Sequence, residues 1–332
     1  MRLLRLSAGA INEPAVAGRI LTHDLGPGLR KGTRLGAENL AALRQFAEVH
    51  VVELEPGDLH EDEAGSRLAA AIAGPGLRLE GPVQSQARLV AERRGLLRVD
   101  REAVVRLNRL WALSVFTLVD GQAVEAGEEV AGAKVTPVAV SAELIAEAER
   151  VAAEGGGPGL LRLVAFRPLR TLVVVTERLK PKARELFFAA VSRKLGWFGA
   201  ELIGLREVAR DPGAVRAAYE EARQSGAELI FFAGASSIDP FDPAYSELQA
   251  VGGRLVRQGA PAHPGSMLWV GRLEQATVLG VASCAGFGRD TSLDLVLPFV
   301  FAYGRIDELD FAQLGYGGLI EKGAGRRFPP YG

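Results

Sequence analysis

The chain has 332 residues, of which 48% are hydrophobic and 24% charged, the proportions of an ordinary soluble globular protein. Its 39 Lys and Arg residues balance 40 Asp and Glu residues, which argues against the basic excess of a dedicated nucleic-acid-binding protein. The single cysteine excludes an intrachain disulfide, and no apolar run approaches the ~20 residues that a membrane-spanning helix needs.

The first region of the chain, residues 1–154, has the pattern of a mixed α+β structure. It becomes β-rich from about residue 112, because apolar and β-branched residues crowd segments 115–119 and 132–140 around an Asp120-Gly121 turn signal. The other expected elements are a strand and turn over residues 13–24, a helix over 36–46, a strand over 49–53 and helices over 62–73 and 142–153.

A glycine-rich stretch, Glu-Gly-Gly-Gly-Pro-Gly, follows at residues 154–159. Such a density of glycine, together with a proline, is incompatible with the inside of a helix or of a central strand. We therefore predict a domain boundary here, with a second domain over residues 160–305 and a C-terminal tail over residues 306–332.

The second domain alternates strands with helices. Residues 171–176 form a continuous apolar and β-branched run, as a strand covered on both faces requires. Asp211 is expected to cap a helix that has Pro212 in its first position, and Asp290 to cap the last helix. The alternation predicts an α/β fold in which a mostly parallel sheet carries helices on both faces. The expected strands are 171–176, 200–205, 228–233, 254–257 and 277–282, and the expected helices are 182–195, 211–225, 243–251 and 292–303.

In such a sheet, ligands bind outside the carboxyl ends of the strands. Three segments are expected to meet at that edge: the turn after Thr176, the loop 234–242 and the turn after residue 282. The loop 234–242 has the most informative composition. Gly234 and Ala235 keep the backbone accessible to a phosphate or a pterin edge, and the hydroxyls of Ser236 and Ser237 can donate to phosphate oxygens.

Asp242 ends this loop directly before Pro243, where a helix is expected to begin. Its carboxylate has two possible roles, a catalytic or metal-binding one and the simple capping of that helix. From the residues alone both roles stay open.

The loop resembles the signature of the molybdenum-cofactor biosynthesis domain, which molybdopterin adenylyltransferases and molybdopterin molybdenumtransferases share. In that family a strand ends in Thr-Gly-Gly-Val-Ser, and an aspartate follows the serine. Gly234, Ser237 and Asp242 stand at the matching positions. A weaker resemblance to the molybdenumtransferase N-terminal region covers residues 19–25 and 29–32. The chain is most similar to a branch of molybdopterin-binding proteins that carry Gly-Ala-Ser-Ala at the loop and Gly-Cys-Ala at the last turn.

The chain also departs from the family pattern. Ala235 replaces the second glycine, and Pro-Gly-Ser-Met at residues 264–267 replaces Pro-Gly-Lys-Pro. Ser-Cys-Ala-Gly at residues 283–286 stands where the family has Leu-Pro-Gly-Asn-Pro. The family's phosphate-binding lysine is therefore missing from its usual place. Arg178, Lys180 and Lys182 could supply that charge, or they could simply form a solvated turn and helix start.

The resemblance implies that the ligand is molybdopterin or its adenylylated form. It implies Asp242 as the catalytic residue and as a ligand of Mg²⁺, which would neutralise phosphate charge. Asp239 would bind the ligand or the metal, or act as a local turn former. Cys284 would lie near the ligand, where a nucleophilic role competes with that of an inert buried thiol. The implied cofactor-binding residues are Thr176, Gly234, Ala235, Ser236, Ser237, Asp239, Pro264, Gly265, Ser266, Ser283, Cys284 and Gly286.

Three functions remain open. The first is an enzyme of molybdenum-cofactor assembly, a transferase acting in metal insertion or adenylylation with molybdate or a nucleotide as co-substrate. The second is a non-catalytic carrier or sensor of molybdopterin for molybdoenzymes. The third, an unrelated nucleotide-binding α/β protein, is disfavoured because both a Walker lysine motif and a Gly-x-Gly-x-x-Gly turn are missing.

The sequence and the resemblance also predict where the protein acts and which partners it has. The N-terminal residues lack the apolar core of a signal peptide, so we expect a cytoplasmic protein without membrane or nucleic-acid partners. A nucleotidyltransferase or a molybdoenzyme is the protein partner that the resemblance implies. Self-association into a homo-oligomer is likewise implied by the resemblance.

Overall fold

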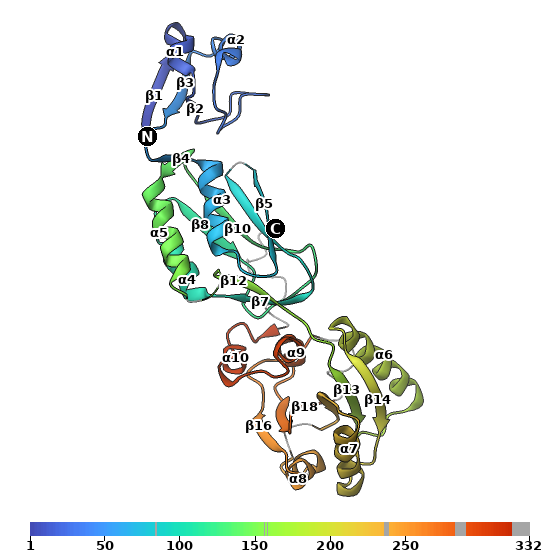
Figure 1. The fold of residues 1–332 in the computed structure, drawn as a ribbon. Coiled ribbons are helices and arrows are strands. Elements are labelled where there is room, and N and C mark those ends of the chain that lie inside the picture. Colours follow the sequence, from blue (N-terminus) through green and yellow to red (C-terminus); the bar gives the residue numbers. More distant parts are fainter. Residues whose placement is uncertain (84, 156, 158, 236–238, 283–289, 321–332) are drawn as a thin grey trace. The chain divides into compact units, whose positions relative to one another are not determined.

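The computed structural model describes all residues except 84, 156, 158, 236–238, 283–289 and 321–332. The chain forms two compact units, unit 1 (Met1–Val164) and unit 2 (Ala165–Gly332), which are coloured blue to green and green to red in Figure 1. None of the helices within the described residues combines the length and the apolar character that crossing a membrane demands.

Unit 1 contains short strands and few long helices. Its strands are β1 (Arg2–Ser7), β2 (Ile20–Leu21), β3 (Glu48–Glu53), β4 (Asp58–His60), β5 (Leu77–Val83), β6 (Gln86–Ala91), β7 (Gly95–Val99), β8 (Leu113–Thr117), β9 (Ala123–Val124), β10 (Glu129–Val135), β11 (Ala139–Ser141) and β12 (Leu161–Ala165). Its helices are the 3₁₀ turns η1 (Ala8–Ala10) and η2 (Ala37–Asn39) and the α-helices α1 (Glu13–Val16), α2 (Leu40–Leu43), α3 (Glu61–Ile72), α4 (Arg101–Asn108) and α5 (Ala142–Ala153).

The largest core of unit 1 lies between helices and an antiparallel sheet with the strand order β5-β6-β10-β8. Helices α3 and α5 lie side by side and contribute Leu68, Ile72 and Ile145 to this core (Figure 1). A smaller core of its own supports the three-stranded sheet β1-β3-β2. Unit 1 is therefore the mixed α+β region that the sequence predicts.

The predicted elements of unit 1 agree with the structure where the periodic pattern is long. The helices expected over residues 62–73 and 142–153 are α3 and α5, and the strand expected over 49–53 is β3. The helix expected over 36–46 is only a 3₁₀ turn followed by four α-helical residues, α2. Strands β5, β6 and β7 precede residue 112, where the β-rich pattern was expected to begin. Gly81-Pro82 and clustered arginines break up their apolar runs.

An ion pair between a partly exposed lysine and a buried carboxylate joins the segment after β2 to the start of α3. The Lys31 Nζ lies 2.6 Å from the Oε2 of Glu61, whose side chain is only 1% exposed. Gly32 has a φ of +84°, and an added Cβ there would overlap the Glu61 carboxylate. His60 caps α3 through its Nδ1, while its Nε2 contacts the Gly32 carbonyl at 3.0 Å. Because a buried carboxylate is costly to leave unpaired, Lys31 stabilises the start of α3 through Glu61.

Unit 2 alternates strands and helices along most of its length. Its strands are β13 (Arg170–Val175), β14 (Glu201–Glu207), β15 (Leu229–Ala233), β16 (Arg254–Gln258), β17 (Trp269–Leu273) and β18 (Ala276–Val281). Its helices are α6 (Pro181–Trp197), α7 (Pro212–Gln224), α8 (Pro243–Ala250), α9 (Ser292–Tyr303) and α10 (Glu308–Gln313).

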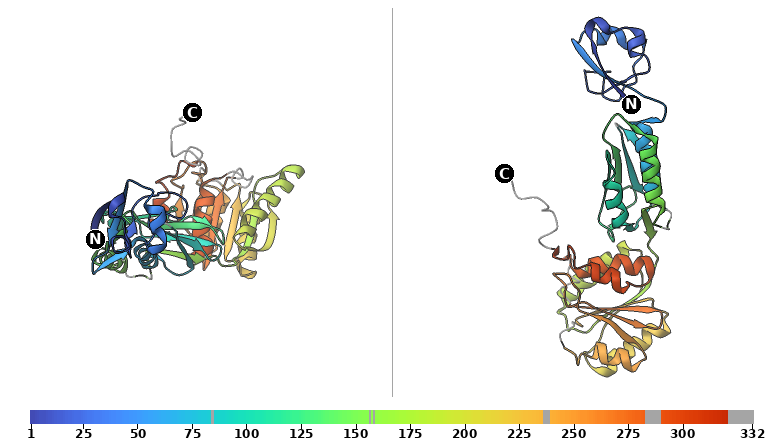
Figure 2. Two further views of the ribbon diagram at one scale, coloured as in Figure 1. Left: turned by 90° about the horizontal axis from the view of Figure 1, so that it is seen from above. Right: turned by 90° about the vertical axis from the view of Figure 1, so that its left-hand side faces the viewer.

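These strands form one six-stranded sheet in the order β14-β13-β15-β18-β17-β16. The four strands from β14 to β18 are parallel, and β17 and β16 complete the sheet with antiparallel pairs. Residues of one face, such as Leu172 and Phe232, pack against α7 and α8. Helices α6 and α9 lie on the other face (Figure 2) and are joined by the Lys194–Asp294 ion pair at 2.6 Å. The predicted α/β fold, with a mostly parallel sheet between two helical layers, is confirmed.

Two details of unit 2 differ from expectation. Strand β17 was not predicted, because Gly271 and Arg272 interrupt its apolar run; in the sheet, Gly271 makes room for the side chain of Leu248. Helix α9 is capped by Thr291 rather than by Asp290, since the Thr291 hydroxyl accepts from Leu293 N and the Asp294 carboxylate accepts from Thr291 N.

Along the chain, the boundary between the two units falls after Val164, downstream of the glycine-rich stretch at residues 154–159. Strand β12 follows that stretch and still pairs with β7 of unit 1. Its Leu163 packs closely over Gly76 and Gly95, where an added Cβ would come within 2.9 Å and 2.8 Å of the leucine side chain. Residues 160–164, which the sequence interpretation placed in the second domain, thus contact unit 1.

Replacing Lys31 by Met should leave the buried Glu61 carboxylate without its cation. We expect a loss of about 3 kcal/mol in the opening free energy of α3, measured by amide hydrogen exchange. Arg67→Met is the matched control, since its partner Glu149 is 37% exposed and an exposed pair contributes under about 1 kcal/mol. Equal effects of the two substitutions would contradict this account of the ion pair.

Candidate functional site

The parallel strands of unit 2 bring several predicted site residues to one edge of the sheet. Strands β14, β13, β15 and β18 all end there, and the pairing continues for one residue beyond two of them. Thr176 N donates to Ala233 O at 3.0 Å, and Gly234 N donates to Val281 O at 2.9 Å. Strand β17 runs the opposite way, so the segment before Trp269 begins at the same edge. We call this the carboxyl edge.

Gly234 is required by both its conformation and its surroundings. Its φ is +87°, in the left-handed region that favours glycine. An added Cβ would lie 2.6 Å from Cγ of Glu177 and 3.1 Å from Oγ1 of Thr176. Glu177 therefore lies over the backbone of the loop, a neighbour that sequence reasoning missed.

Trp269 fixes the position of the next residue in the loop. Its fully buried indole donates from Nε1 to Ala235 O at 2.8 Å and packs against the Tyr245 ring at 4.9 Å. The indole lies over Gly280 of β18, where any Cβ would overlap it. The sequence signal that could have identified this contact is a tryptophan that faces a glycine on the neighbouring strand.

Asp242 is buried, and both oxygens of its carboxylate are engaged. Oδ1 accepts from Ala244 N at 2.9 Å and caps α8, with Pro243 in the first helical turn. Oδ2 accepts from the guanidinium of Arg210, which follows β14 and is 42% exposed. The predicted capping role is thus present, and Arg210 is a second site residue that sequence reasoning missed. A metal ion could bind Oδ2 only by competing with Arg210.

Asp239 forms a local turn. Its Oδ1 accepts from Phe241 N at 2.9 Å, and its carbonyl accepts from Asp242 N at 3.1 Å. These contacts match the turn-forming alternative that the sequence left open. Among the described residues, no group of three or more His, Cys, Asp or Glu side chains is arranged to hold a metal ion.

The predicted site residues 264–266 are tied to the start of α9. Ser292 donates from its Oγ to Gly265 O at 2.5 Å and from its backbone N to Pro264 O at 2.9 Å. Ser266 is exposed, and its carbonyl accepts from Ala260 N at 2.9 Å. The remaining predicted site residues, Ser236, Ser237, Ser283, Cys284 and Gly286, lie outside the described residues.

Positive charge collects where the chain leaves β13. Arg178, Lys180 and Lys182 are exposed, and none of the three forms an ion pair with another described residue. Arg184, one turn further along α6, pairs instead with Glu207 at 3.5 Å. Three cations without a described partner, together with the partly exposed Arg210, make the carboxyl edge suited to an anionic ligand.

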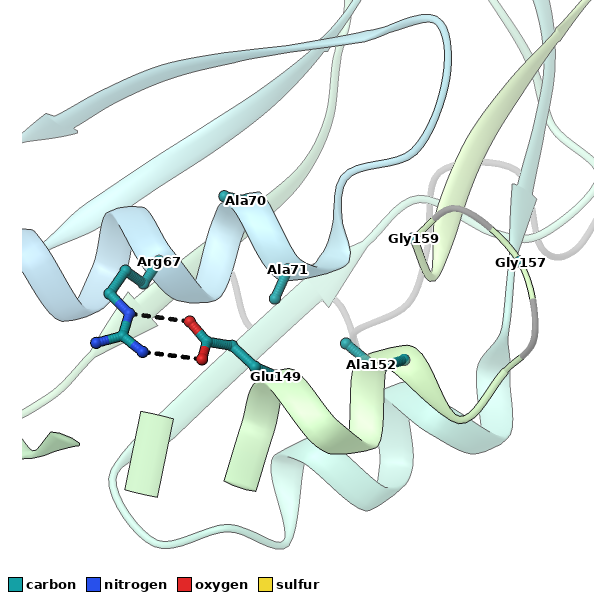
Figure 3. A pocket seen from close by; sticks show the side chains of 8 residues that line it. Arg67, Ala70, Ala71, Glu149, Ala152, Gly157 and Gly159 are labelled. Carbon is teal, nitrogen blue, oxygen red and sulfur yellow. Dashed lines mark hydrogen bonds and ion pairs between the residues drawn. The ribbon is translucent and has the colours of Figure 1, made fainter. Parts of the chain in front are cut away.

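A hollow of about 400 Å³ lies elsewhere, in unit 1 between α3 and α5 (Figure 3). Its wall consists mostly of alanines and glycines, and Arg67 and Glu149 face each other across it. They form two hydrogen bonds, at 2.9 and 2.8 Å. Among the described residues that line the hollow, the two charged side chains pair with each other. The residues that line it are Arg67, Ala70, Ala71, Glu149, Ala152, Ala153, Gly157 and Gly159.

The Asp242 carboxylate also acts on two nearby phenols. Burial, and then the negative charge of Asp242, raise the pKa of Tyr219 and Tyr245 well above the ordinary value. Tyr219 additionally donates to Ala244 O at 2.7 Å, in the first turn of α8. Both phenols therefore stay neutral beside the charged pair of Arg210 and Asp242.

Comparison with known proteins gives only distant similarities. No protein-family model matches the chain, and no curated protein sequence matches it. Among solved structures, a molybdopterin biosynthesis enzyme MoaB from Thermus thermophilus is 18% identical, with a TM-score of 0.30 over 40% of this chain and 91% of that one.

Two further structures are similarly distant. A molybdopterin biosynthesis Mog protein from Mycobacterium ulcerans is 16% identical, with a TM-score of 0.31 over 40% of this chain and 95% of that one. A molybdopterin biosynthesis MoeA protein from Pyrococcus horikoshii is 14% identical, with a TM-score of 0.31 over 81% of this chain and 79% of that one. Scores this low assign the chain to no family, so its function has to be inferred from its own residues.

The contact of Trp269 with Gly280 can be tested by substitution. Gly280→Ala places a methyl group inside the indole, and we expect unit 2 to lose about 3 kcal/mol of unfolding free energy in urea. Gly196→Ala in α6 meets no atom within 4 Å and should instead stabilise unit 2 by about 0.5 kcal/mol. A Gly280→Ala protein as stable as the wild type would contradict the described packing.

The phenol pKa values predict a dependence on alkaline pH. Because folding raises the pKa of Tyr219 and Tyr245, their contribution to stability is complete below about pH 10, the pKa of a free phenol. It is lost as the pH rises toward their folded-state pKa. In an absorbance titration, Asp242→Asn should make both phenols ionise at lower pH, whereas Glu207→Gln should not. An unchanged titration of the Asp242→Asn protein would contradict the assigned cause.

Proposed function

We propose that unit 2 binds a molybdopterin-type pterin phosphate at its carboxyl edge and acts in molybdenum-cofactor biosynthesis. The observation that carries the proposal is the Arg210–Asp242 pair. It lies at the end of the loop whose sequence resembles the molybdopterin-binding signature, on the sheet edge where α/β proteins bind ligands.

The charges of the edge support a phosphate ligand. A guanidinium binds phosphate through two parallel hydrogen bonds, and Asp242 occupies only part of the donor set of Arg210. Arg178, Lys180 and Lys182 add positive charge after the neighbouring strand β13. They stand in for the lysine that the loop 264–267 lacks relative to the family pattern.

The contacts of Asp242 favour binding and positioning over catalysis. Its carboxylate caps α8 and holds Arg210, so its described role is to orient a cation toward the ligand. A Mg²⁺ ion at Asp242 would have to displace Arg210 from Oδ2, and the described residues supply no group of three or more His, Cys, Asp or Glu ligands. We therefore place the carrier or sensor role ahead of a transferase role. Partner molybdoenzymes and self-association remain part of the proposal through the resemblance alone.

The proposal is tested by titrating the whole chain with molybdopterin. We expect Arg210→Gln to raise the Kd about tenfold to a hundredfold, the loss of one or two charge-assisted hydrogen bonds. Arg216→Gln is the matched control, because Arg216, on α7, likewise pairs with a buried carboxylate, that of Glu247 at 2.7 Å. This control should bind as the wild type does.

The same samples distinguish the two roles. With Mg-ATP and molybdate added, a carrier binds molybdopterin without turnover, whereas adenylylation or metal insertion that Asp242→Asn abolishes would establish the transferase role. A wild-type protein that does not bind molybdopterin would contradict both.

A further inference from the structure

Phe241 lies on the surface at a point where the chain is otherwise tightly held. Its side chain is 87% exposed, whereas Asp242, the next residue, is 1% exposed. The Phe241 amide donates to the Asp239 carboxylate, and the Asp242 amide donates to the Asp239 carbonyl. The ring is therefore presented to solvent by a backbone that hydrogen bonds fix on both sides.

Arg210, the proposed phosphate-binding group, is linked to this segment through Asp242. Arg210 contacts the carboxylate of Asp242, one residue from Phe241. Met267, 40% exposed, lies on the segment before β17 at the same edge, and Trp269 ties that segment to Ala235 of the loop. Phe241, Met267 and Arg210 thus all belong to segments of the carboxyl edge, and Phe241 is linked to Arg210 through its chain neighbour Asp242.

We propose that Phe241 stacks on the fused heterocycle of the bound pterin while Arg210 pairs with its phosphate, so that the site selects planar, phosphorylated ligands. This inference rests on the proposed function and adds the residue that recognises the ring. Aromatic side chains stack on flat heterocycles with a gain beyond simple area burial. In this arrangement Phe241 recognises the heterocycle of the ligand, and Arg210 recognises its phosphate.

The test uses the full chain with three probes: a pterin monophosphate, the same pterin without phosphate, and inorganic phosphate. We expect Phe241→Ala to weaken both pterin probes about tenfold and to leave the affinity for inorganic phosphate unchanged. Phe241→Trp should retain the binding. Quenching of pterin fluorescence on binding, a direct sign of stacking, should disappear in Phe241→Ala and persist in Phe241→Trp.

Trp111→Ala is the control for removing an exposed aromatic side chain, since Trp111 is 69% exposed and belongs to unit 1. It should change none of the three affinities. If the wild type binds the pterin phosphate and Phe241→Ala binds and quenches it equally well, the inference is overturned and the proposed function stands. An equal loss of affinity for inorganic phosphate would also overturn it, because Phe241 would then act by holding the shape of the loop and not by stacking on the pterin. A wild type that binds neither pterin probe would overturn the proposed function together with the inference.

Discussion

The buried carboxylate of Asp242 is the constraint on which the candidate site depends. One of its oxygens caps helix α8, and the other accepts from Arg210 in the connection between β14 and α7. Burying a carboxylate costs free energy unless it is paired and hydrogen-bonded. The burial of Asp242 therefore requires both the amide at the start of α8 and the guanidinium of Arg210. Burial, and then this charge, raise the pKa of Tyr219 and Tyr245, so both phenols stay neutral beside the pair, whereas Arg210 is 42% exposed.

The sheet supplies the geometry that this pair needs. Parallel strands deliver their carboxyl ends to one edge, and Trp269 locks the loop after β15 onto the adjacent strands through Ala235 and Gly280. The resulting edge carries positive charge and an exposed ring, whereas the hollow of unit 1 is lined by small side chains and a satisfied ion pair. This contrast in chemistry, rather than the depth of either surface, favours the carboxyl edge as the ligand site.

Sequence periodicity predicted most of unit 2, because fully buried strands such as β13 and well-capped helices such as α7 carry strong local signals. The residues of the loop also offered the capping of α8 as one of two roles for Asp242, and the structure shows this capping. Sequence periodicity did not identify Arg210 or Trp269, since their importance comes from partners 32 and 34 residues away in the chain. Strand β17 was missed for a related reason: Gly271 weakens its local pattern but makes tertiary room for Leu248.

Amide hydrogen exchange of the whole chain, with and without a saturating pterin phosphate, tests the location of the site most directly. Binding at the carboxyl edge should slow exchange in the segments after β13, β14 and β15, including Arg210 and the residues from Asp239 to Asp242. Exchange in α3 and α5 of unit 1 should stay the same. Protection confined to α3 and α5, with none at the carboxyl edge, would contradict the account.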